Sequence, residues 1–384
     1  MLRSDVRIGR IAGVPVYLNW TVVVLVWLLG SMFITRVLPD ADPGLAPGAR
    51  LVLGLAGAAA FVGSILAHEV GHAVMAKRGG VPVDSIRVWL FGGLAQLAGE
   101  ARRPGIALRI AVAGPAVSLA VGFAAVGLEV LLDTWGVAPG LAAVASWLGR
   151  INLLLAALNL LPALPLDGGR VLEAALWWRW GDRDRAVRTA AGAGRVLGYG
   201  LVAVGAFVLL RGGGFGGLWL GLIGFFLASS ARLEAEGHRA RSALAGTTVG
   251  EVMSPVVPTV PSYLTVEEFL RDHVAHQPHA TWTVRSWGGE LEGVVSAARL
   301  AGLPTERRAL VHLREVAVPI DQVPWARPDE LVLDVLGRAA DAAVLVVDVE
   351  QQQLRGMLSP ADVHRAILQR AGAPRAPRSW SPVG

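Results

Sequence analysis

The sequence contains no cysteine and is poor in charge. The absence of cysteine excludes disulfides, thiolate metal sites, iron–sulfur clusters and a cysteine nucleophile. Charged residues make up only 17% of the 384 residues, whereas hydrophobic residues make up 53%. An ordinary globular domain carries about 25% charged residues. The composition therefore excludes a wholly soluble protein.

The shortage of charge is confined to the first part of the chain. Residues 1–240 contain long uncharged runs and an excess of basic over acidic residues, whereas residues 241–384 are slightly acidic and contain no such run. We therefore predict a membrane domain over 1–240 and a soluble domain over 241–372. The basic residues stand at the ends of apolar runs, as membrane flanks do. Without a polybasic tract or basic residues interleaved with aromatics, nothing indicates a nucleic-acid partner.

Six apolar runs are long enough to span a membrane. A helix that crosses about 30 Å of hydrocarbon needs about 20 apolar residues, and the qualifying runs are about 16–38, 51–76, 106–132, 141–161, 193–210 and 215–231. The fold class that we predict is a polytopic α-helical membrane protein with about six transmembrane helices and a C-terminal cytosolic α/β domain.

Charge predicts the orientation of these spans. Lys and Arg concentrate before the first run and in the loops 77–109 and 170–195, which the positive-inside rule assigns to the cytoplasm. An even number of spans then predicts cytoplasmic termini in a multi-pass plasma-membrane protein. Between the second and third runs, the β-branched residues of 81–97 and the pair Gly92–Gly93 indicate a short hairpin at the membrane surface. A plain connecting loop is the alternative.

The second run ends in an HExxH motif. His68 and His72 are one helical turn apart and therefore lie on one face, close enough to share a metal ion. Glu69 lies beside them, where it can accept a proton from a water activated by the metal. Two imidazoles and a carboxylate inside a membrane cost several kcal/mol unless they are paired or liganded. The alternative is a water-exposed helix end with incidental histidines.

A third ligand is predicted from the fourth run. Catalytic zinc usually has three protein ligands, and without cysteine the third must be His, Asp or Glu. The segment from Asn159 to Gly169 (NLLPALPLDGG) ends on the cytoplasmic side, and its prolines break the helix so that Asp167 can turn inward. Asp167 is therefore the predicted third ligand. Asn159 could donate to a developing oxyanion, or it could equally be a buried Asn bonded to a neighbouring backbone.

The soluble part contains a weak twofold repeat. Val249–Met253 is echoed by Leu313–Ala317, and Gly293–Ser296 is echoed by Gly356–Ser359, 63 residues on. A repeat of about 60 residues predicts two similar α/β units packed together, over about 247–303 and 313–371. The Pro-rich tail 373–384 is predicted to be disordered.

Three motifs in order give the membrane domain a family resemblance. HExxH in one span, N-x2-P-x4-LDGG in a later one and FGG between them resemble the site-2 protease family of intramembrane zinc metalloproteases. The resemblance implies one zinc ion held by His68, His72 and Asp167, with Glu69 as the catalytic base and Asn159 assisting. It further implies that Phe91, Gly92 and Gly93 engage the substrate strand. The implied substrate is the transmembrane segment of another protein, cut near the cytoplasmic face, as in regulated intramembrane proteolysis.

The soluble domain resembles a tandem CBS-domain pair, which places the chain with the CBS-bearing branch of that family. Ser359 and Asp362 resemble the S/T-x-x-D element that holds a nucleotide ribose, whereas the equivalent segment Ser296–Arg299 ends in Arg. The resemblance therefore implies at most one standard adenine-nucleotide pocket. A purely structural pair, or one that forms a homodimer, is an equal alternative.

Two other functions compete with the protease. A CBS-regulated transporter or channel would carry ionisable residues along several spans, and the first, third, fifth and sixth runs offer almost none. A catalytically silent adaptor with a structural zinc site would have no need for Glu69. The sequence therefore favours a zinc endopeptidase.

Overall fold

The computed structural model describes residues 5–90, 92–97, 99–274, 281–300, 302–339, 344–348 and 353–371. Two predictions fall outside these ranges, namely the role of Phe91 and the disorder of the tail 373–384. The chain divides into two compact units, Met1–Glu236 and Gly237–Gly384.

The predicted number of spans is confirmed. Among the described residues, six helices are long and apolar enough to cross a membrane, namely Thr21–Ala41, Pro47–Arg78, Pro104–Trp135, Pro139–Asn159, Arg183–Leu210 and Gly214–Leu244. The first contains α1 (Thr21–Met32), a π-helical turn (Phe33–Val37) and α2 (Leu38–Ala41), and the others are α3, α4, α5, α7 and α8 in that order. The short helix α6 (Asp167–Trp180) lies between α5 and α7.

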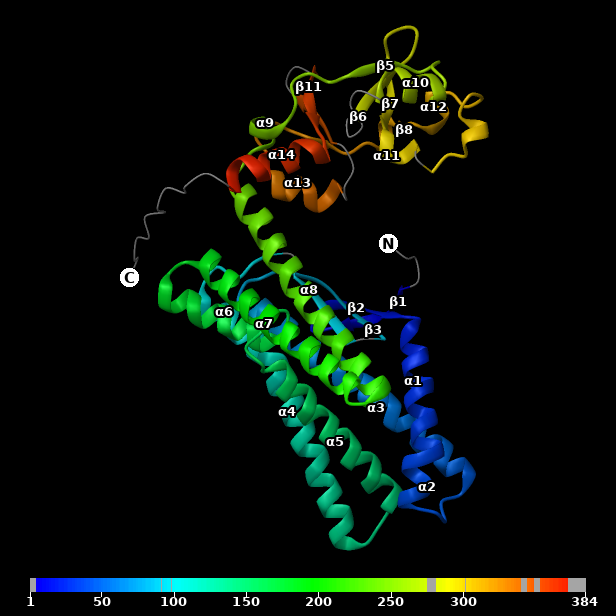
Figure 1. Ribbon diagram of the computed structural model, residues 1–384, viewed down its shortest axis with the longest axis vertical. Helices are drawn as coiled ribbons and strands as arrows, with labels where there is room; N and C mark the ends of the chain where they lie inside the picture. The colour runs from blue at the N-terminus through cyan, green and yellow to red at the C-terminus, as the bar shows by residue number, and fades with distance from the viewer. Residues whose placement is uncertain are drawn as a thin grey trace. The chain divides into compact units, whose positions relative to one another are not determined.

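Proline and glycine mark the ends of these helices. Proline occupies the first turn of α3, α4 and α5, where its missing N–H would have no helical partner in any case. Gly136 after α4 and Gly181 after α6 adopt left-handed conformations, with φ of 62° and 71°, and so end their helices in the usual way. Helices α4 and α5 form an antiparallel hairpin in the membrane unit (Figure 1).

A four-stranded sheet completes the membrane unit. Its strands are β1 (Asp5–Ile11), β2 (Val14–Asn19), β3 (Val83–Trp89) and β4 (Gly92–Leu97), in the order β1-β2-β3-β4. The predicted hairpin over 81–97 is therefore present as β3 and β4, which pair antiparallel. It is not isolated, because β3 also pairs parallel with β2.

The start of the first predicted span is wrong. Val16 to Asn19 belong to β2, and the helix begins only at Thr21. Val14 and Val16 are fully buried with Ala73 of α3 and Ile86 of β3. These valines continue the apolar run into the helix, so composition alone could not separate the strand from the span. The chain's one lysine, Lys77, donates from Nζ to the Ala12 carbonyl at 2.7 Å and holds the turn between β1 and β2 against α3.

The C-terminal unit contains the predicted twofold repeat. The first half runs α9 (Val249–Val252), β5 (Thr259–Pro261), α10 (Val266–Asp272), β6 (Thr281–Arg285), β7 (Leu291–Ser296) and α11 (Ala297–Leu300). The second half runs α12 (Leu313–Val316), β9 (Trp325–Ala326), α13 (Val332–Ala339), β10 (Val344–Asp348), β11 (Gln353–Leu358) and α14 (Pro360–Ala371). In each half a parallel pair of strands is followed by an antiparallel pair.

The two halves exchange backbone contacts in an equivalent way. Strand β8 (Val318–Pro319), which follows the short helix of the second half, pairs with β7 of the first. Ser254, which follows the short helix of the first half, pairs with Met357 of β11. A Cβ on Gly293 would lie 2.3 Å from the Val318 oxygen, and a Cβ on Gly356 would lie 2.6 Å from the Ser254 oxygen. The repeated glycines therefore leave room for the other half's backbone.

Candidate metal centre

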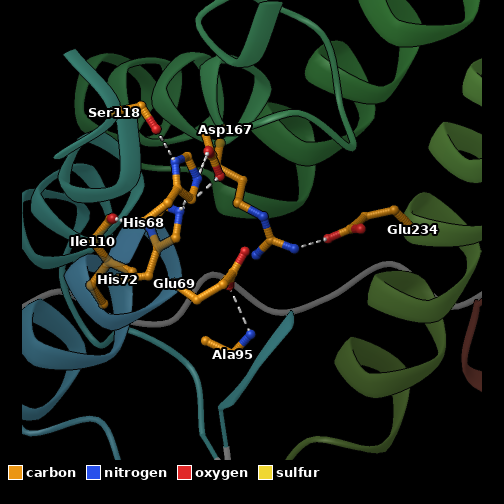
Figure 2. Close-up of polar contacts among 9 residues, drawn as sticks. His68, Glu69, His72, Ala95, Ile110, Ser118, Asp167 and Glu234 are labelled. Atoms are coloured by element: carbon orange, nitrogen blue, oxygen red, sulfur yellow. Dashed lines mark hydrogen bonds and ion pairs between the residues drawn. The ribbon is translucent and has the colours of Figure 1, made fainter. Parts of the chain in front are cut away.

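Helix α3 carries the HExxH motif, and α6 begins at the aspartate that the sequence singled out. His68 and His72 are four residues apart in α3, with ring centroids 4.9 Å apart. Asp167 is the first residue of α6, after an irregular segment that follows α5. Their side chains converge (Figure 2). His68 is 6% exposed, His72 12% and Asp167 15%, so all three are largely removed from solvent.

The distances between the three groups fit a shared cation. His68 Nε2 lies 3.2 Å from Asp167 Oδ2 and 3.2 Å from His72 Nε2. His72 Nε2 lies 3.4 Å from Asp167 Oδ1. Tetrahedral zinc, with bonds of about 2.0–2.2 Å, keeps its ligand atoms about 3.3 Å apart. Two imidazoles and one carboxylate are also ligand types that zinc accepts, so the residues present fit this ion.

Asp167 presents both carboxylate oxygens to the histidines, with Oδ2 facing His68 Nε2 and Oδ1 facing His72 Nε2. One turn further along α6, Arg170 donates to Glu234 of α8 at 3.1 Å, an ion pair drawn in Figure 2.

The remaining nitrogens of the two histidines contact α4. His72 Nδ1 lies 2.7 Å from the Ile110 carbonyl, and His68 Nδ1 lies 2.8 Å from Ser118 Oγ. A carbonyl only accepts hydrogen bonds, so His72 carries its proton on Nδ1 and keeps the Nε2 lone pair for a metal. Ser118 and Ile110 were not among the predicted site residues. The signal available for Ser118 was a polar residue inside an otherwise apolar run.

Glycines allow the surrounding backbone to approach these groups. A Cβ on Gly114 of α4 would lie 2.2 Å from His72 Nε2 and 2.5 Å from His68 Nε2. A Cβ on Gly168 would lie 2.4 Å from the Leu160 carbonyl group, and one on Gly169 would lie 2.2 Å from the Leu164 nitrogen. The LDGG glycines thus pack the start of α6 onto the segment that precedes it.

Glu69 contacts the edge of the sheet. Its Oε2 accepts a hydrogen bond from the Ala95 N–H of β4 at 2.9 Å (Figure 2). A Cβ on Gly93 would lie 2.2 Å from Glu69 Cγ. Because β4 is the last strand of the sheet, the backbone groups that face away from β3 point toward the base. The two predicted hairpin glycines therefore differ in their surroundings. Gly93 packs on Glu69, whereas an ideal Cβ on Gly92 would have nothing within 4 Å.

Asn159 is not tied to the three converging groups. It is the last residue of α5 and is half-buried. Within the described part of the chain, its side chain forms no hydrogen bond with His68, His72 or Asp167.

The predicted ribose-binding pair lies in the C-terminal unit as a helix cap. Asp362 Oδ2 accepts from the Ser359 N–H at 2.9 Å and from Ser359 Oγ at 2.6 Å. Asp362 Oδ1 accepts from Ser254 Oγ at 2.7 Å and from Arg365 at 3.1 Å. The reciprocal bonds between Ser359 and Asp362 form a capping box at the start of α14. Both carboxylate oxygens are thus engaged within the chain.

The chain is similar to known metalloproteases. The family model described as Peptidase family M50 matches residues 56–134 and 135–204, which include both histidines and Asp167. The chain is 38% identical over 386 residues to the "Putative zinc metalloprotease Rip3" of Mycobacterium tuberculosis, covering 99% of this chain and 98% of that protein.

Two solved structures resemble separate parts of the chain. A site-2 protease from Methanocaldococcus jannaschii is 25% identical, with a TM-score of 0.39 over 60% of this chain and 95% of that one. The CBS domain of a bacterial CNNM/CorC family Mg2+ transporter is 21% identical, with a TM-score of 0.28 over 35% of this chain and 83% of that one. Because the mycobacterial relative matches nearly the whole chain at 38% identity, the chain belongs to peptidase family M50, the site-2 protease family of zinc metalloproteases.

Proposed function

We propose that this metalloprotease cuts the transmembrane segment of a membrane-protein substrate near the cytoplasmic face, with zinc held by His68, His72 and Asp167. The observation that carries the proposal is the convergence of two imidazole nitrogens and a carboxylate to 3.2–3.4 Å of one another beside Glu69. In this proposal Glu69 is the general base.

The depth of the site supports cleavage within the membrane. Helix α3 continues for nine residues beyond His68 before it reaches Lys77 and then Arg78, a distance of about 14 Å at 1.5 Å per residue. These basic residues mark the helix end at the membrane surface. The ligands therefore lie below the surface but closer to the end of α3 that carries the charge.

The chain's own residues supply the proton transfers. Zinc, when bound, polarises the scissile carbonyl and lowers the pKa of a water molecule. Glu69 accepts a proton from the attacking water and delivers it to the leaving nitrogen. The Ala95 N–H holds one oxygen of Glu69, which fixes the carboxylate while leaving its other oxygen for the proton.

The free edge of β4 is the proposed place for the substrate. A transmembrane helix must unwind before attack, because its carbonyls are held in i→i−4 hydrogen bonds. An unwound segment has unpaired backbone groups that an exposed strand edge can pair. Strand β4 presents such an edge beside Glu69, so pairing there would bring the substrate backbone to the base. Substrates with helix-weakening residues near the cut site should be preferred.

The loops of the membrane unit support cytoplasmic termini. The turns between α2 and α3, between α4 and α5 and between α7 and α8 are only a few residues long. The opposite ends of the helices carry the basic segments 77–109 and 170–195. The positive-inside rule places those segments, and with them both termini, in the cytoplasm, and we assign the chain to the plasma membrane.

The C-terminal unit is the proposed regulatory module in regulated intramembrane proteolysis. Its paired α/β halves would bind an adenine nucleotide at Ser359 and Asp362, or join two chains in a homodimer. A ribose would have to replace the bond that Ser254 donates to Asp362. Addition of AMP or ATP to the purified full-length chain, with its thermal unfolding midpoint as the readout, tests the nucleotide directly.

The central experiment compares the wild type with Glu69→Gln in liposomes that contain a single-span substrate. We expect Glu69→Gln to bind zinc as the wild type does but to lose cleavage by about 100-fold or more, the range that a general base contributes. A chelator should abolish cleavage by the wild type. Gel analysis of the substrate and metal analysis of the protein give both readouts.

Two outcomes would contradict the proposal. Equal cleavage by the wild type and Glu69→Gln would remove Glu69 as the base. Full zinc occupancy with no cleavage of any of a broad set of single-span substrates would indicate a structural zinc site.

A further inference from the structure

One face of α4 contacts both histidines of the HExxH motif. Ile110, Gly114 and Ser118 are spaced by four residues and therefore lie on the same side of the helix. The first offers its carbonyl to His72 Nδ1, and the third offers its hydroxyl to His68 Nδ1. The glycine between them has no side chain to push the imidazoles away. Ile110 and Ser118 thus contact the Nδ1 atoms, which a metal would not occupy, and Gly114 leaves room beside the Nε2 atoms.

Ser118 is the one side chain on this face that bonds a histidine. It is fully buried, with 0% of its surface exposed, in a helix whose neighbours are almost all apolar. Its Oγ lies 2.8 Å from His68 Nδ1, on a residue 50 positions away in the sequence. A buried hydroxyl in such surroundings is costly unless it is hydrogen-bonded, and the bond that it forms is to a proposed zinc ligand.

This contact provides a partner for the ring proton of a metal-bound His68, because a serine hydroxyl can accept a hydrogen bond as well as donate one. When Nε2 binds a metal, the ring proton must sit on Nδ1, where it is donated to Ser118 Oγ. Without that partner, the ring can rotate or carry its proton on Nε2, and both changes weaken a metal site. Partners of this kind are worth about 10–100-fold in metal affinity or activity.

We infer that Ser118 is a positioning residue of the metal centre, which fixes the ring orientation of His68 from α4 by accepting the Nδ1 proton that His68 carries when Nε2 binds the metal. The inference rests on the proposed zinc ligands and adds a fourth side chain on which the site depends. Ser118 contacts neither substrate nor metal, so its effect should appear first in zinc binding.

The test measures zinc affinity of the full-length protein in detergent by competition with a chromophoric chelator. Ser118→Ala removes the hydroxyl and leaves the helix intact. Ser64→Ala is the matched control, because Ser64 is also buried in a spanning helix but donates only to the Phe61 carbonyl of its own helix, at 2.8 Å. His68→Ala reports whether the proposed ligand itself binds zinc.

We expect Ser118→Ala to weaken zinc binding by about 10-fold or more, with Ser64→Ala unchanged and the metal-free unfolding midpoint the same in both. The absorption spectrum of Co2+ bound in place of zinc should also change in Ser118→Ala alone, because it reports the geometry of the ligands.

A second pair of variants tests how closely α4 approaches the Nε2 atoms of both histidines. Gly114→Ala places a methyl group against both imidazoles, whereas Gly127→Ala adds one in the same helix where nothing lies within 4 Å. Only Gly114→Ala should lose zinc affinity.

Two results would overturn the inference and are distinguishable. If His68→Ala loses zinc while Ser118→Ala binds within about twofold of the wild type, well below the effect of a true outer-shell partner, the ligands stand and Ser118 has no positioning role. If His68→Ala binds zinc as the wild type does, the proposed ligand set is wrong, and the inference fails with it.

Discussion

The two units each bury a carboxylate among polar groups, but the partners differ in kind. In the C-terminal unit, Asp362 accepts hydrogen bonds from an N–H and from two hydroxyls, so its charge is satisfied by donors of the chain itself. In the membrane unit, Asp167 faces the Nε2 atoms of His68 and His72. His72 carries its proton on Nδ1, so its Nε2 presents a lone pair to the carboxylate. A carboxylate surrounded by donors has its hydrogen bonds satisfied. A carboxylate that faces nitrogen lone pairs needs a cation between them. The difference separates a helix cap from a metal site.

The largest effect is expected when the carboxylate of Asp167 is removed from the membrane unit. Asp167→Ala should lower zinc affinity by more than about 100-fold, beyond the range of an outer-shell partner, and should abolish cleavage. Metal analysis after dialysis and the liposome cleavage assay measure the two effects. The control is Asp133→Ala, at the opposite end of the membrane unit in the last turn of α4. Retention of zinc by Asp167→Ala would contradict the assignment of the third ligand.

A smaller effect is expected when Glu69 is displaced and the proposed zinc ligands are left in place. Gly93→Ala places a methyl group against Glu69 Cγ and should displace the carboxylate without touching the histidines. We expect kcat to fall by about 10- to 100-fold, within the range that general base catalysis supplies, while zinc affinity stays at the wild-type value. Gly63→Ala in α3, where nothing lies within 4 Å, serves as the control. Loss of zinc by Gly93→Ala would contradict this prediction, because it would show that zinc binding depends on the position of Glu69.

The smallest effect belongs to the C-terminal carboxylate. Asp362→Ala should leave zinc binding unchanged and destabilise its own unit by about 1–3 kcal/mol, because it leaves the buried Ser359 hydroxyl and the half-buried Ser254 hydroxyl without their acceptor. Urea unfolding of the full-length chain, followed by a probe in the C-terminal unit, measures this loss. Asp329→Ala removes an exposed partner of Arg327 and should change stability by less than about 0.5 kcal/mol. An Asp362→Ala variant as stable as the wild type would show that the cap contributes nothing.

Much of the membrane unit could be predicted because each helix that crosses a bilayer needs a long apolar run. Spans follow from runs of apolar residues, and the HExxH spacing places His68 and His72 on one face whatever surrounds them. Asp167 could be found because few ionisable residues stand near the same end of another span. Local sequence and the thickness of the membrane are sufficient for these predictions.

The partners of the histidines could not be predicted in the same way. Ser118 and Gly114 belong to a helix without a motif, and their contacts depend on how α4 packs across α3. The strand β2 was missed because its valines pair with β3, more than 60 residues away. Long-range pairing leaves no periodic signal that distinguishes such a strand from the start of an apolar helix.

In the C-terminal unit, the fold could be predicted from the sequence but the function of one motif could not. Its twofold order was visible in Gly293 and Gly356, and these glycines occupy equivalent close approaches. The function of the S-x-x-D element was not visible, because the same four residues serve a helix cap or a ribose equally well. In the structure the element caps α14, and nucleotide binding at the same residues stays a prediction.

The contact between Lys77 and Ala12 has a practical consequence. Since the sequence has one lysine, an amine-reactive dye has one internal attachment point, at the end of the helix that carries the HExxH motif. Lys77 is exposed and donates from Nζ to the β1–β2 turn, so a dye attached there would report on the contact between the N-terminal hairpin and α3. The unmodified protein therefore carries a single internal labelling site at this contact.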